Sequence, residues 1–312
     1  MDRKIIEESL QGSNYALGRL ISFLDDWEKR KQIMKEIEPH TGKAYIIGIT
    51  GPTGAGKSTL ISSLVTHLRN LDLTLGLLCV DPTSPFSGGS ILGDRLRMKN
   101  HSLDRGVFIR SLASRDWLGG TSPTTREAVK LLDASGRDIV IVESAGAGQA
   151  QVDVRNVADT VLVVAVPGLG DSIQMLKAGL MEIADIFVLN MADREGSERM
   201  LKELEDAAVR FEGPWQPPVI STVATREEGV DKLYGAILDH RKYLQESGLL
   251  LQRRRERNLE HTLELVHDRL KDNLASQLKK QPELVQLVKR LRAGELDPYT
   301  ASAKILECML QS

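Results

Sequence analysis

One short segment constrains the fold of this 312-residue chain more than any other. Residues 51–58 read Gly-Pro-Thr-Gly-Ala-Gly-Lys-Ser and match the pattern G-x-x-x-x-G-K-[ST] in full. They follow an apolar, β-rich run that ends at Thr50 and precede a helix-like run over residues 59–68. A glycine-rich loop between a strand and a helix directs backbone N–H groups and a helix N-terminus toward phosphate groups. The segment therefore predicts a phosphate-binding loop.

The residue types in this loop predict how it holds a nucleotide. We expect the Lys57 ammonium group to neutralise the β- and γ-phosphates and the Ser58 hydroxyl to ligate Mg²⁺. The glycines let the backbone wrap around the phosphates. The candidate nucleotide-binding residues of the loop are Gly51, Thr53, Gly54, Ala55, Gly56, Lys57, Ser58 and Thr59.

The rest of the chain predicts an α/β fold with a mostly parallel sheet flanked by helices. Residues 44–245 alternate short β-rich runs with helical stretches, an order typical of parallel strands joined by right-handed crossovers. Several runs are apolar nearly throughout, as expected of strands covered on both faces. The candidate strands are residues 44–50, 75–80, 107–110, 138–143, 160–166, 186–190 and 219–222.

Helical patterning divides the chain into three regions. We expect residues 1–43 to form a helical extension, residues 44–245 the phosphate-loop domain, and residues 246–312 a helical arm. An apolar row in the arm either packs on the core of the same subunit or docks a second subunit, and the sequence leaves both open. The row consists of Leu259, Leu263, Val266, Leu270, Leu274 and Leu278. Pro282 and residues 294–298 should separate the arm into individual helices.

Composition excludes several classes of protein. A net charge of −2 gives no electrostatic reason to expect nucleic acid or an anionic membrane as a partner. The two cysteines, Cys79 and Cys308, cannot build a disulfide framework or a CxxC metal clip. No apolar run approaches the roughly 18–20 residues of a membrane span, and no secretory signal is evident. We expect a cytoplasmic protein.

Acidic residues near strand ends are candidates for the metal site and for catalysis. Asp81, Asp94 and Glu143 could hold Mg²⁺ directly or through water, and not all three need to contact it. Gln149, in a glycine-rich stretch after Glu143, could orient the attacking water. The predicted catalytic residues are therefore Lys57, Gln149 and Asp94.

A second motif concerns the base. Asn190-Met191-Ala192-Asp193 follows an apolar run, where guanine-specific proteins carry N-K-x-D. The Asp accepts from N1–H and the exocyclic amine of guanine. Adenine lacks that amine and has an amino donor where guanine has a carbonyl, so it would leave buried polar groups of the protein unpaired, which can discriminate by about 10⁴-fold. Met191 replaces the usual Lys and can still cover the ring. Asn190, Asp193 and, from the next strand, Ser221 complete the predicted nucleotide-binding set.

These residues together resemble one family, the cobalamin-trafficking GTPase chaperones of methylmalonyl-CoA mutase and related adenosylcobalamin mutases. The most specific marker is the stretch Gly-Gly-Ser-Ile-Leu-Gly-Asp at residues 88–94. The resemblance rests on residues 48–59, 80–84, 87–95, 167–171, 177–179, 182–186, 190–193 and 297–299, together with Gln174.

The resemblance implies a homodimer held by the C-terminal arm, with GTP or GDP and Mg²⁺ as cofactors. It implies that GTP hydrolysis gates cobalamin delivery to an adenosylcobalamin-dependent mutase or protects that mutase. The sequence shows no obvious arginine finger, so we expect hydrolysis to be slow without the partner. The family's additional switch would map onto residues 167–179, with Asp171, Gln174 and Lys177 as its polar members.

The chain also departs from the family. Residues 143–151 read Glu-Ser-Ala-Gly-Ala-Gly-Gln-Ala-Gln where the family usually has E-T-V-G-V-G-Q-S-E, and Met191 replaces a lysine. These changes leave the phosphate and metal chemistry in place and allow a paralogue with another corrinoid enzyme as client.

Three other functions are compatible with a phosphate-binding loop. The first is an ATPase or kinase associated with basic amino-acid transport, against which Asn190 and Asp193 argue. The second is a metallochaperone GTPase, although the histidines are scattered and the cysteines solitary. The third is an interaction scaffold with a degenerate site, against which Lys57, Ser58 and Asp81 argue.

Overall fold

The computed structural model describes residues 3–82, 101, 103–114, 123–144, 154–168 and 181–310. The chain forms two compact units, Met1–Arg253 and Arg254–Ser312. The boundary lies within one long helix, so the predicted arm at residues 246–312 begins before the second unit does. The predicted extension at residues 1–43 lies in the same compact unit as the phosphate-loop region.

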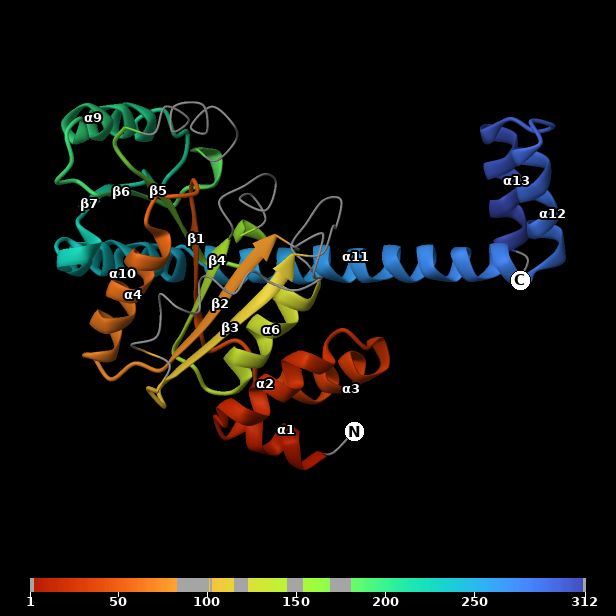
Figure 1. Ribbon diagram of the computed structural model, residues 1–312, viewed down its shortest axis with the longest axis horizontal. Coiled ribbons are helices and arrows are strands. Elements are labelled where there is room, and N and C mark those ends of the chain that lie inside the picture. The colour runs from red at the N-terminus through yellow and green to blue at the C-terminus, as the bar shows by residue number, and fades with distance from the viewer. Residues whose placement is uncertain are drawn as a thin grey trace. The chain divides into compact units, whose positions relative to one another are not determined.

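The first unit is built on a seven-stranded sheet with the order β3-β2-β4-β1-β5-β6-β7 (Figure 1). Every pairing within it is parallel, which confirms the predicted fold class. The strands are β1 (Tyr45–Thr50), β2 (Leu75–Pro82), β3 (Val107–Ser114), β4 (Ile139–Ser144), β5 (Thr160–Ala165), β6 (Ile186–Asn190) and β7 (Val219–Thr222).

Both faces of the sheet are covered because its central strands are apolar on both sides. Every residue of β1, β4, β5 and β6 is buried. In β1, Ile46 packs into the core on one face, and Ile47 and Ile49 pack into the core on the other. A parallel sheet with helices on both faces requires such continuous apolar strands.

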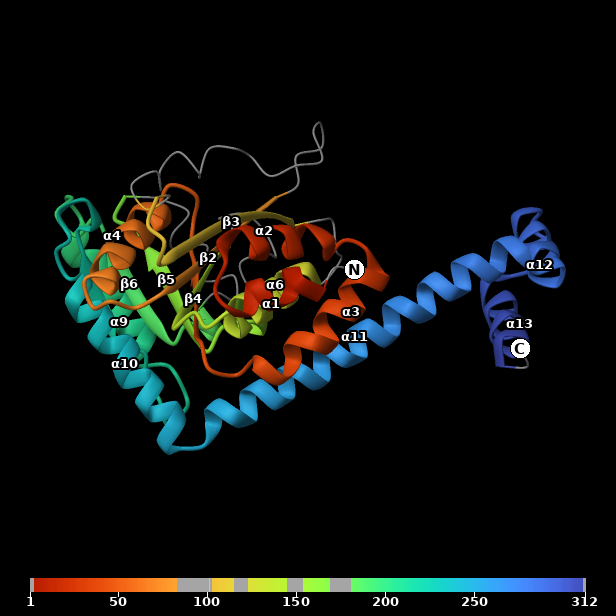
Figure 2. The same cartoon turned by 90° about the horizontal axis from the view of Figure 1, so that it is seen from below.

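The helices divide between the two faces, as Figure 2 shows for α4 and α10 on one side and α1, α2, α3 and α6 on the other. The face covered by α4 and α10 contains the core around Ile47, and α9 contributes to the opposite core. These helices are α1 (Arg3–Leu10), α2 (Asn14–Phe23), α3 (Trp27–Ile37), α4 (Lys57–Arg69), α6 (Pro123–Ala134), α9 (Ser197–Ala208) and α10 (Val230–Glu246).

The N-terminal helices are tied to the sheet by one buried carboxylate. Asp133, in α6, accepts hydrogen bonds from the backbone N–H groups of Lys43 at 3.0 Å and Ala44 at 2.8 Å. The Gly42 N–H donates to the same carboxylate. This contact fixes the chain where it passes from the N-terminal helices into β1, the strand that leads to the phosphate-binding loop.

The second unit consists of helices alone among its described residues. It contains most of α11 (Leu249–Lys280), followed by α12 (Pro282–Arg292) and α13 (Pro298–Leu310). The predicted breaks are confirmed, since Pro282 begins α12 and Pro298 begins α13. Asp297 caps α13 by accepting from the N–H groups of Tyr299 and Thr300, each at 2.9 Å.

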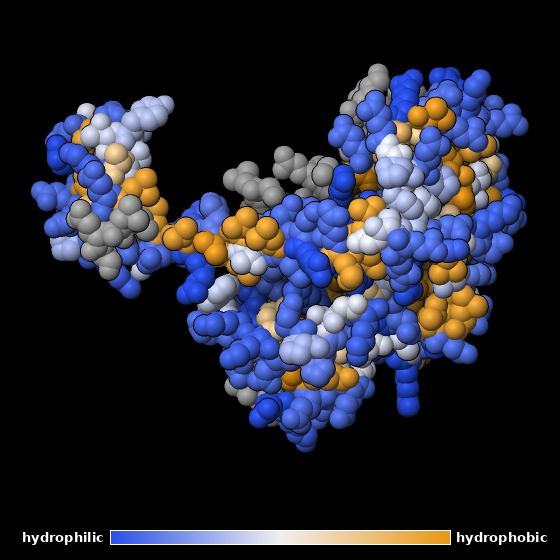
Figure 3. Space-filling view, turned by 180° about the vertical axis from the view of Figure 1, so that it is seen from behind, coloured by the Kyte–Doolittle hydropathy of each residue, from blue (hydrophilic) through white to orange (hydrophobic). Residues whose placement is uncertain are grey.

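Along α11, apolar side chains of the predicted row remain exposed, namely Leu259, Leu263, Val266 and Leu270. Figure 3 shows hydrophobic surface, in orange, along this helix. Among the helices that the structure describes, none combines the length and apolar character needed to cross a membrane.

Candidate nucleotide-binding site

The phosphate-binding loop joins β1 to α4 at the carboxyl end of the sheet, where parallel α/β folds place their ligands. Two of its glycines are required by their surroundings. A Cβ atom on Gly51 would lie 2.3 Å from the Val164 carbonyl oxygen, and one on Gly56 would lie 2.6 Å from Asn190 Nδ2. Gly56 also has a left-handed φ of 76°, which glycine adopts without strain.

Lys57 is held inside this loop. Its ammonium group donates to the carbonyl oxygens of Gly51 and Pro52, both at 2.9 Å. The side chain is buried, and a buried ammonium group requires such acceptors. The loop thus concentrates a positive charge beside its own backbone N–H groups.

Ser58 and Glu143 come together from neighbouring elements. The Ser58 hydroxyl, at the start of α4, donates to Glu143 Oε1 at 3.1 Å, and both residues are buried. Glu143 lies near the end of β4, which pairs directly with β1. A hydroxyl beside a carboxylate is the kind of oxygen donor set that Mg²⁺ accepts with few protein ligands. These two residues therefore fit the predicted metal site.

Other predicted residues are placed only in part. Asp81 lies near the end of β2, and β2 pairs with β4, so its backbone is at the same end of the sheet as Glu143. Asp94 and Gln149 lie outside the described residues, as do Asp171, Gln174 and Lys177. Within the described part of the chain, no group of three or more His, Cys, Asp and Glu side chains is arranged to hold a metal ion.

Asn190 connects the phosphate-binding loop to the ends of β6 and β7. Its Nδ2 donates to the Ala55 carbonyl oxygen at 2.9 Å. Its Oδ1 accepts from the Thr222 hydroxyl at 3.2 Å and from the Ala224 N–H at 3.3 Å. The side chain is 1% exposed, so these bonds satisfy an amide that has no access to water.

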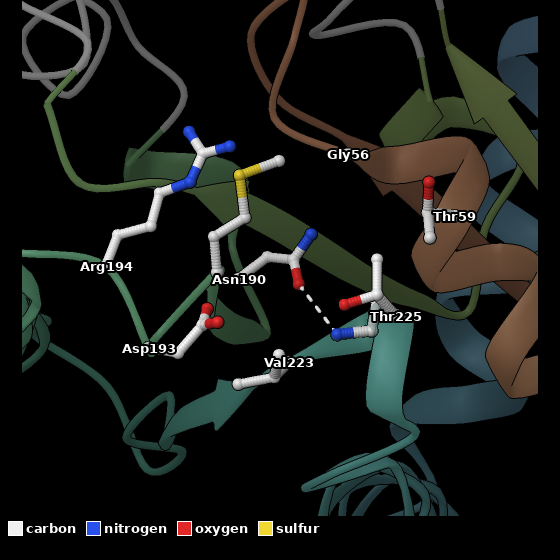
Figure 4. Close-up of a pocket in the computed structure, with 9 residues that line it drawn as sticks. Gly56, Thr59, Asn190, Asp193, Arg194, Val223 and Thr225 are labelled. Atoms are coloured by element: carbon white, nitrogen blue, oxygen red, sulfur yellow. Dashed lines mark hydrogen bonds between the residues drawn. The ribbon is translucent and has the colours of Figure 1, made fainter.

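Beside Asn190 lies a pocket of about 140 Å³. Figure 4 shows Arg194 and Thr225 on opposite sides of it, with the Asp193 carboxylate between the loops that follow β6 and β7. Met191 also lines it and holds a left-handed φ of 56°. The lining residues are Gly56, Thr59, Asn190, Met191, Asp193, Arg194, Val223, Ala224 and Thr225. Four predicted nucleotide-binding residues thus surround one pocket: Gly56, Thr59, Asn190 and Asp193.

The sequence-based prediction missed part of this lining. Ser221 is exposed on the edge strand β7 and is not among the lining residues, which include Val223, Ala224 and Thr225 instead. Their position in the sequence could have identified these three residues. Ligands contact residues just beyond the carboxyl ends of parallel strands, and β7 ends at Thr222. Arg194 carried no sequence signal of its own.

A parallel sheet with this loop between β1 and α4, a buried hydroxyl–carboxylate pair and a separate pocket at the ends of β6 and β7 defines a P-loop nucleoside-triphosphatase. The family model described as methylmalonyl-CoA mutase-associated GTPase, MeaB, matches residues 18–279. The chain belongs to this family, which confirms the family resemblance of the sequence.

Comparison with individual proteins gives the same result. The chain is 45% identical over 311 residues to a candidate GTPase of Pyrococcus abyssi, covering 97% of this chain and 95% of the relative. It is 34% identical over 261 residues to GTPase ArgK of Escherichia coli, covering 80% of this chain and 79% of the relative. A crystal structure of an LAO/AO transport system kinase superposes with a TM-score of 0.73 at 25% identity, covering 100% of this chain and 99% of that chain.

Proposed function

We propose that this chain binds GTP with Mg²⁺ and hydrolyses it to GDP and phosphate. The observation that carries the proposal is the Asn190–Ala55 hydrogen bond, which joins the candidate base pocket to the phosphate-binding loop. A nucleotide with its base beside Asp193 would have its phosphates at Lys57. The relatives named as GTPases support the same assignment.

Catalysis in this proposal is electrostatic. Lys57 and the backbone N–H groups of the loop would stabilise negative charge on the phosphate oxygens. Ser58 would hold Mg²⁺, with Glu143, Asp81 and Asp94 as the candidate carboxylates, and the bound ion would neutralise charge on the β- and γ-phosphates. Gln149 remains the candidate for orienting the attacking water, and Asp94 remains a further candidate catalytic residue. We expect slow hydrolysis in the absence of a partner.

Guanine selectivity would come from Asp193. Its carboxylate can accept from both N1–H and the exocyclic amine of guanine, and Met191 would cover the ring. Xanthine replaces that amine with a carbonyl oxygen, which pairs with an amide donor and not with a carboxylate. The base preference should therefore follow the chemical identity of residue 193.

The Asp193→Asn variant tests this assignment in a titration with GDP and xanthosine diphosphate. We expect the Kd for GDP to rise about 100-fold or more, since hydrogen bonds to a charged group contribute about 1.5–3 kcal/mol each. Xanthosine diphosphate should bind the variant better than it binds the wild type. Asp206→Asn, an exposed change on α9, is the matched control and should alter neither ligand. Unchanged GDP binding by Asp193→Asn would remove Asp193 from the base site.

We further propose that the chain is a homodimeric chaperone that gates cobalamin delivery to an adenosylcobalamin-dependent mutase or protects that mutase. The family description, which names methylmalonyl-CoA mutase, supports this client class. Residues 167–179 are the proposed coupling segment. A purified mutase of this class should accelerate GTP hydrolysis by the wild type and accelerate it less in Lys177→Ala. No acceleration of the wild type would argue against this client.

A further inference from the structure

We propose that Arg226 is a positioning residue that sets guanine selectivity by holding the Asp193 carboxylate for the base. This inference rests on the proposed function, because it assigns how the same pocket reads a guanine nucleotide. It concerns a residue that lies outside the N-x-x-D motif and outside the pocket lining.

The carboxylate and the guanidinium group face each other across two loops. Arg226 Nη2 lies 3.4 Å from Asp193 Oδ2, and Arg226 Nε lies 3.0 Å from Glu228 Oε1. Asp193 follows β6, whereas Arg226 and Glu228 follow β7. The guanidinium group thus links the Asp193 loop to a carboxylate on the neighbouring loop.

The backbone that carries Arg226 is fixed. Residues Ala224–Arg226 form a single 3-10 turn, closed by a hydrogen bond from the Arg226 N–H to the Val223 carbonyl oxygen at 2.9 Å. The Val223 N–H in turn donates to the Glu228 carbonyl oxygen at 3.0 Å. Gly229 then packs so closely on β7 that a Cβ atom would lie 2.2 Å from the Ser221 carbonyl oxygen.

The turn that carries Arg226 matters because Asp193 is itself half exposed, with 44% of its side chain accessible. Among the described residues that line the pocket, it is the one carboxylate. An exposed side chain on a loop must be immobilised when a ligand binds, and a partner that holds it beforehand reduces that entropic cost. Each carboxylate oxygen has two lone pairs, so Asp193 can accept from Arg226 and from the base together.

Loss of Arg226 should therefore weaken most the binding of the ligand that makes the most hydrogen bonds to Asp193. GDP offers both N1–H and the exocyclic amine, whereas inosine diphosphate lacks the amine. An Asp193 carboxylate that is no longer held in place cannot accept from N1–H and the exocyclic amine together, and only GDP offers both donors. The ratio of inosine diphosphate Kd to GDP Kd, which measures selectivity for the amine, should fall when Arg226 is removed.

The test measures both ligands, with Mg²⁺, against full-length wild type, Arg226→Ala and Arg226→Lys. We expect Arg226→Ala to lower the selectivity ratio about 3- to 10-fold, because the Asp193 side chain would then have to be immobilised when the ligand binds. Arg226→Lys should restore part of it, because the charge is kept and the planar fork is lost. The control is Arg199→Ala, which removes another Arg–Glu pair, that of the exposed Arg199 on α9. A wild-type ratio in Arg226→Ala would overturn the proposal.

A double-mutant cycle shows whether Arg226 acts through Asp193. In the Asp193→Asn background, Arg226→Ala should change the ratio no further, whereas independent sites would give additive changes. Additive changes would also overturn the proposal. If the wild type fails to bind GDP, the proposed function fails. If it binds and selects GDP while Arg226→Ala behaves as wild type, only this inference fails.

Discussion

At the scale of single residues, Asn190 is tightly constrained where it lines the candidate base pocket. Its amide donates to the phosphate-binding loop and accepts from a side chain and a backbone N–H near the end of β7. Gly56 packs against the same amide so closely that even a methyl group would collide with it. Asn190 therefore contributes to the folding of the site as well as to its chemistry.

Replacing Asn190 with Ala should lower the free energy of unfolding by about 1–3 kcal/mol, because it leaves buried polar groups such as the Ala55 carbonyl oxygen without a partner. Urea denaturation measures the change. Asn70→Ala, an exposed change at the end of α4, should stay within about 0.5 kcal/mol of wild type. Equal stability of the two variants would show that the Asn190 bonds contribute nothing to folding.

Local motifs explain which site residues were predictable. Lys57, Ser58 and Asn190 sit in patterns whose spacing encodes their geometry, and the Ser58–Glu143 contact follows from the adjacency of β1 and β4. The Arg226–Asp193 pair could not be predicted, because it joins residues on two loops with no shared motif. Such a contact depends on how β6 and β7 pair, which the sequence does not display.

At the scale of elements, a polar cluster links α10 to the ends of β1 and β5 opposite the phosphate-binding loop. The Thr160 hydroxyl hydrogen-bonds with the Tyr45 hydroxyl and lies 2.8 Å from His240 Nδ1. His240 Nε2 lies 3.3 Å from Asp185 Oδ1, just before β6. Burial lowers the pKa of His240, and the neighbouring Asp185 opposes that shift only in part.

This lowered pKa predicts the direction of a pH effect. The unfolded chain takes up a proton at His240 near pH 6.5, whereas the folded protein takes it up only at a lower pH. The stability contributed by neutral His240 is therefore fully present above about pH 6.5 and is lost as the pH falls toward the folded pKa, by at most about 1.4 kcal/mol per pH unit. Urea denaturation at pH 7.5 and 5.5 should show a smaller loss in His240→Gln than in wild type. His40→Gln, at an exposed position, should show the wild-type loss. An equal loss in all three proteins would contradict a buried neutral imidazole.

All seven predicted strands are present, and the errors in the prediction concern the residues at which strands begin and end. The prediction stopped one strand at residue 110, whereas β3 continues to Ser114. Residues 111–114 lack a continuous apolar pattern, and they extend because β2 pairs with them as far as Pro82 with Ser114. Pairing with a neighbouring strand decides such ends, and a single sequence does not show it.

At the scale of the whole molecule, the apolar row on α11 carries the proposed homodimer. Leu259, Leu263 and Leu270 are 62%, 60% and 56% exposed, a repeated exposure of large apolar side chains on one helix. A contiguous apolar surface of this kind commonly marks an interface. Of the two uses of this row that the sequence allows, a second subunit is the one that the proposed homodimer requires.

Light scattering after size-exclusion chromatography tests this interface. The wild type should have twice the 34.5 kDa chain mass, and Leu263→Glu with Leu270→Glu should reduce it to one chain, because two charges would be buried in the interface. Lys271→Glu, an exposed change on the same helix outside the apolar row, should remain dimeric. A monomeric wild type, or a dimeric double variant, would remove this surface from the interface.

The central claim is that the loop at residues 51–58 and the pocket beside Asn190 bind one guanine nucleotide. Isothermal titration calorimetry with GDP and with ADP, each with Mg²⁺, on wild type and Lys57→Ala tests it most directly. We predict saturable binding of GDP to the wild type, much weaker binding of ADP, and loss of GDP affinity in Lys57→Ala. Equal affinity for ADP, or GDP binding that persists unchanged without the Lys57 ammonium group, would contradict the claim.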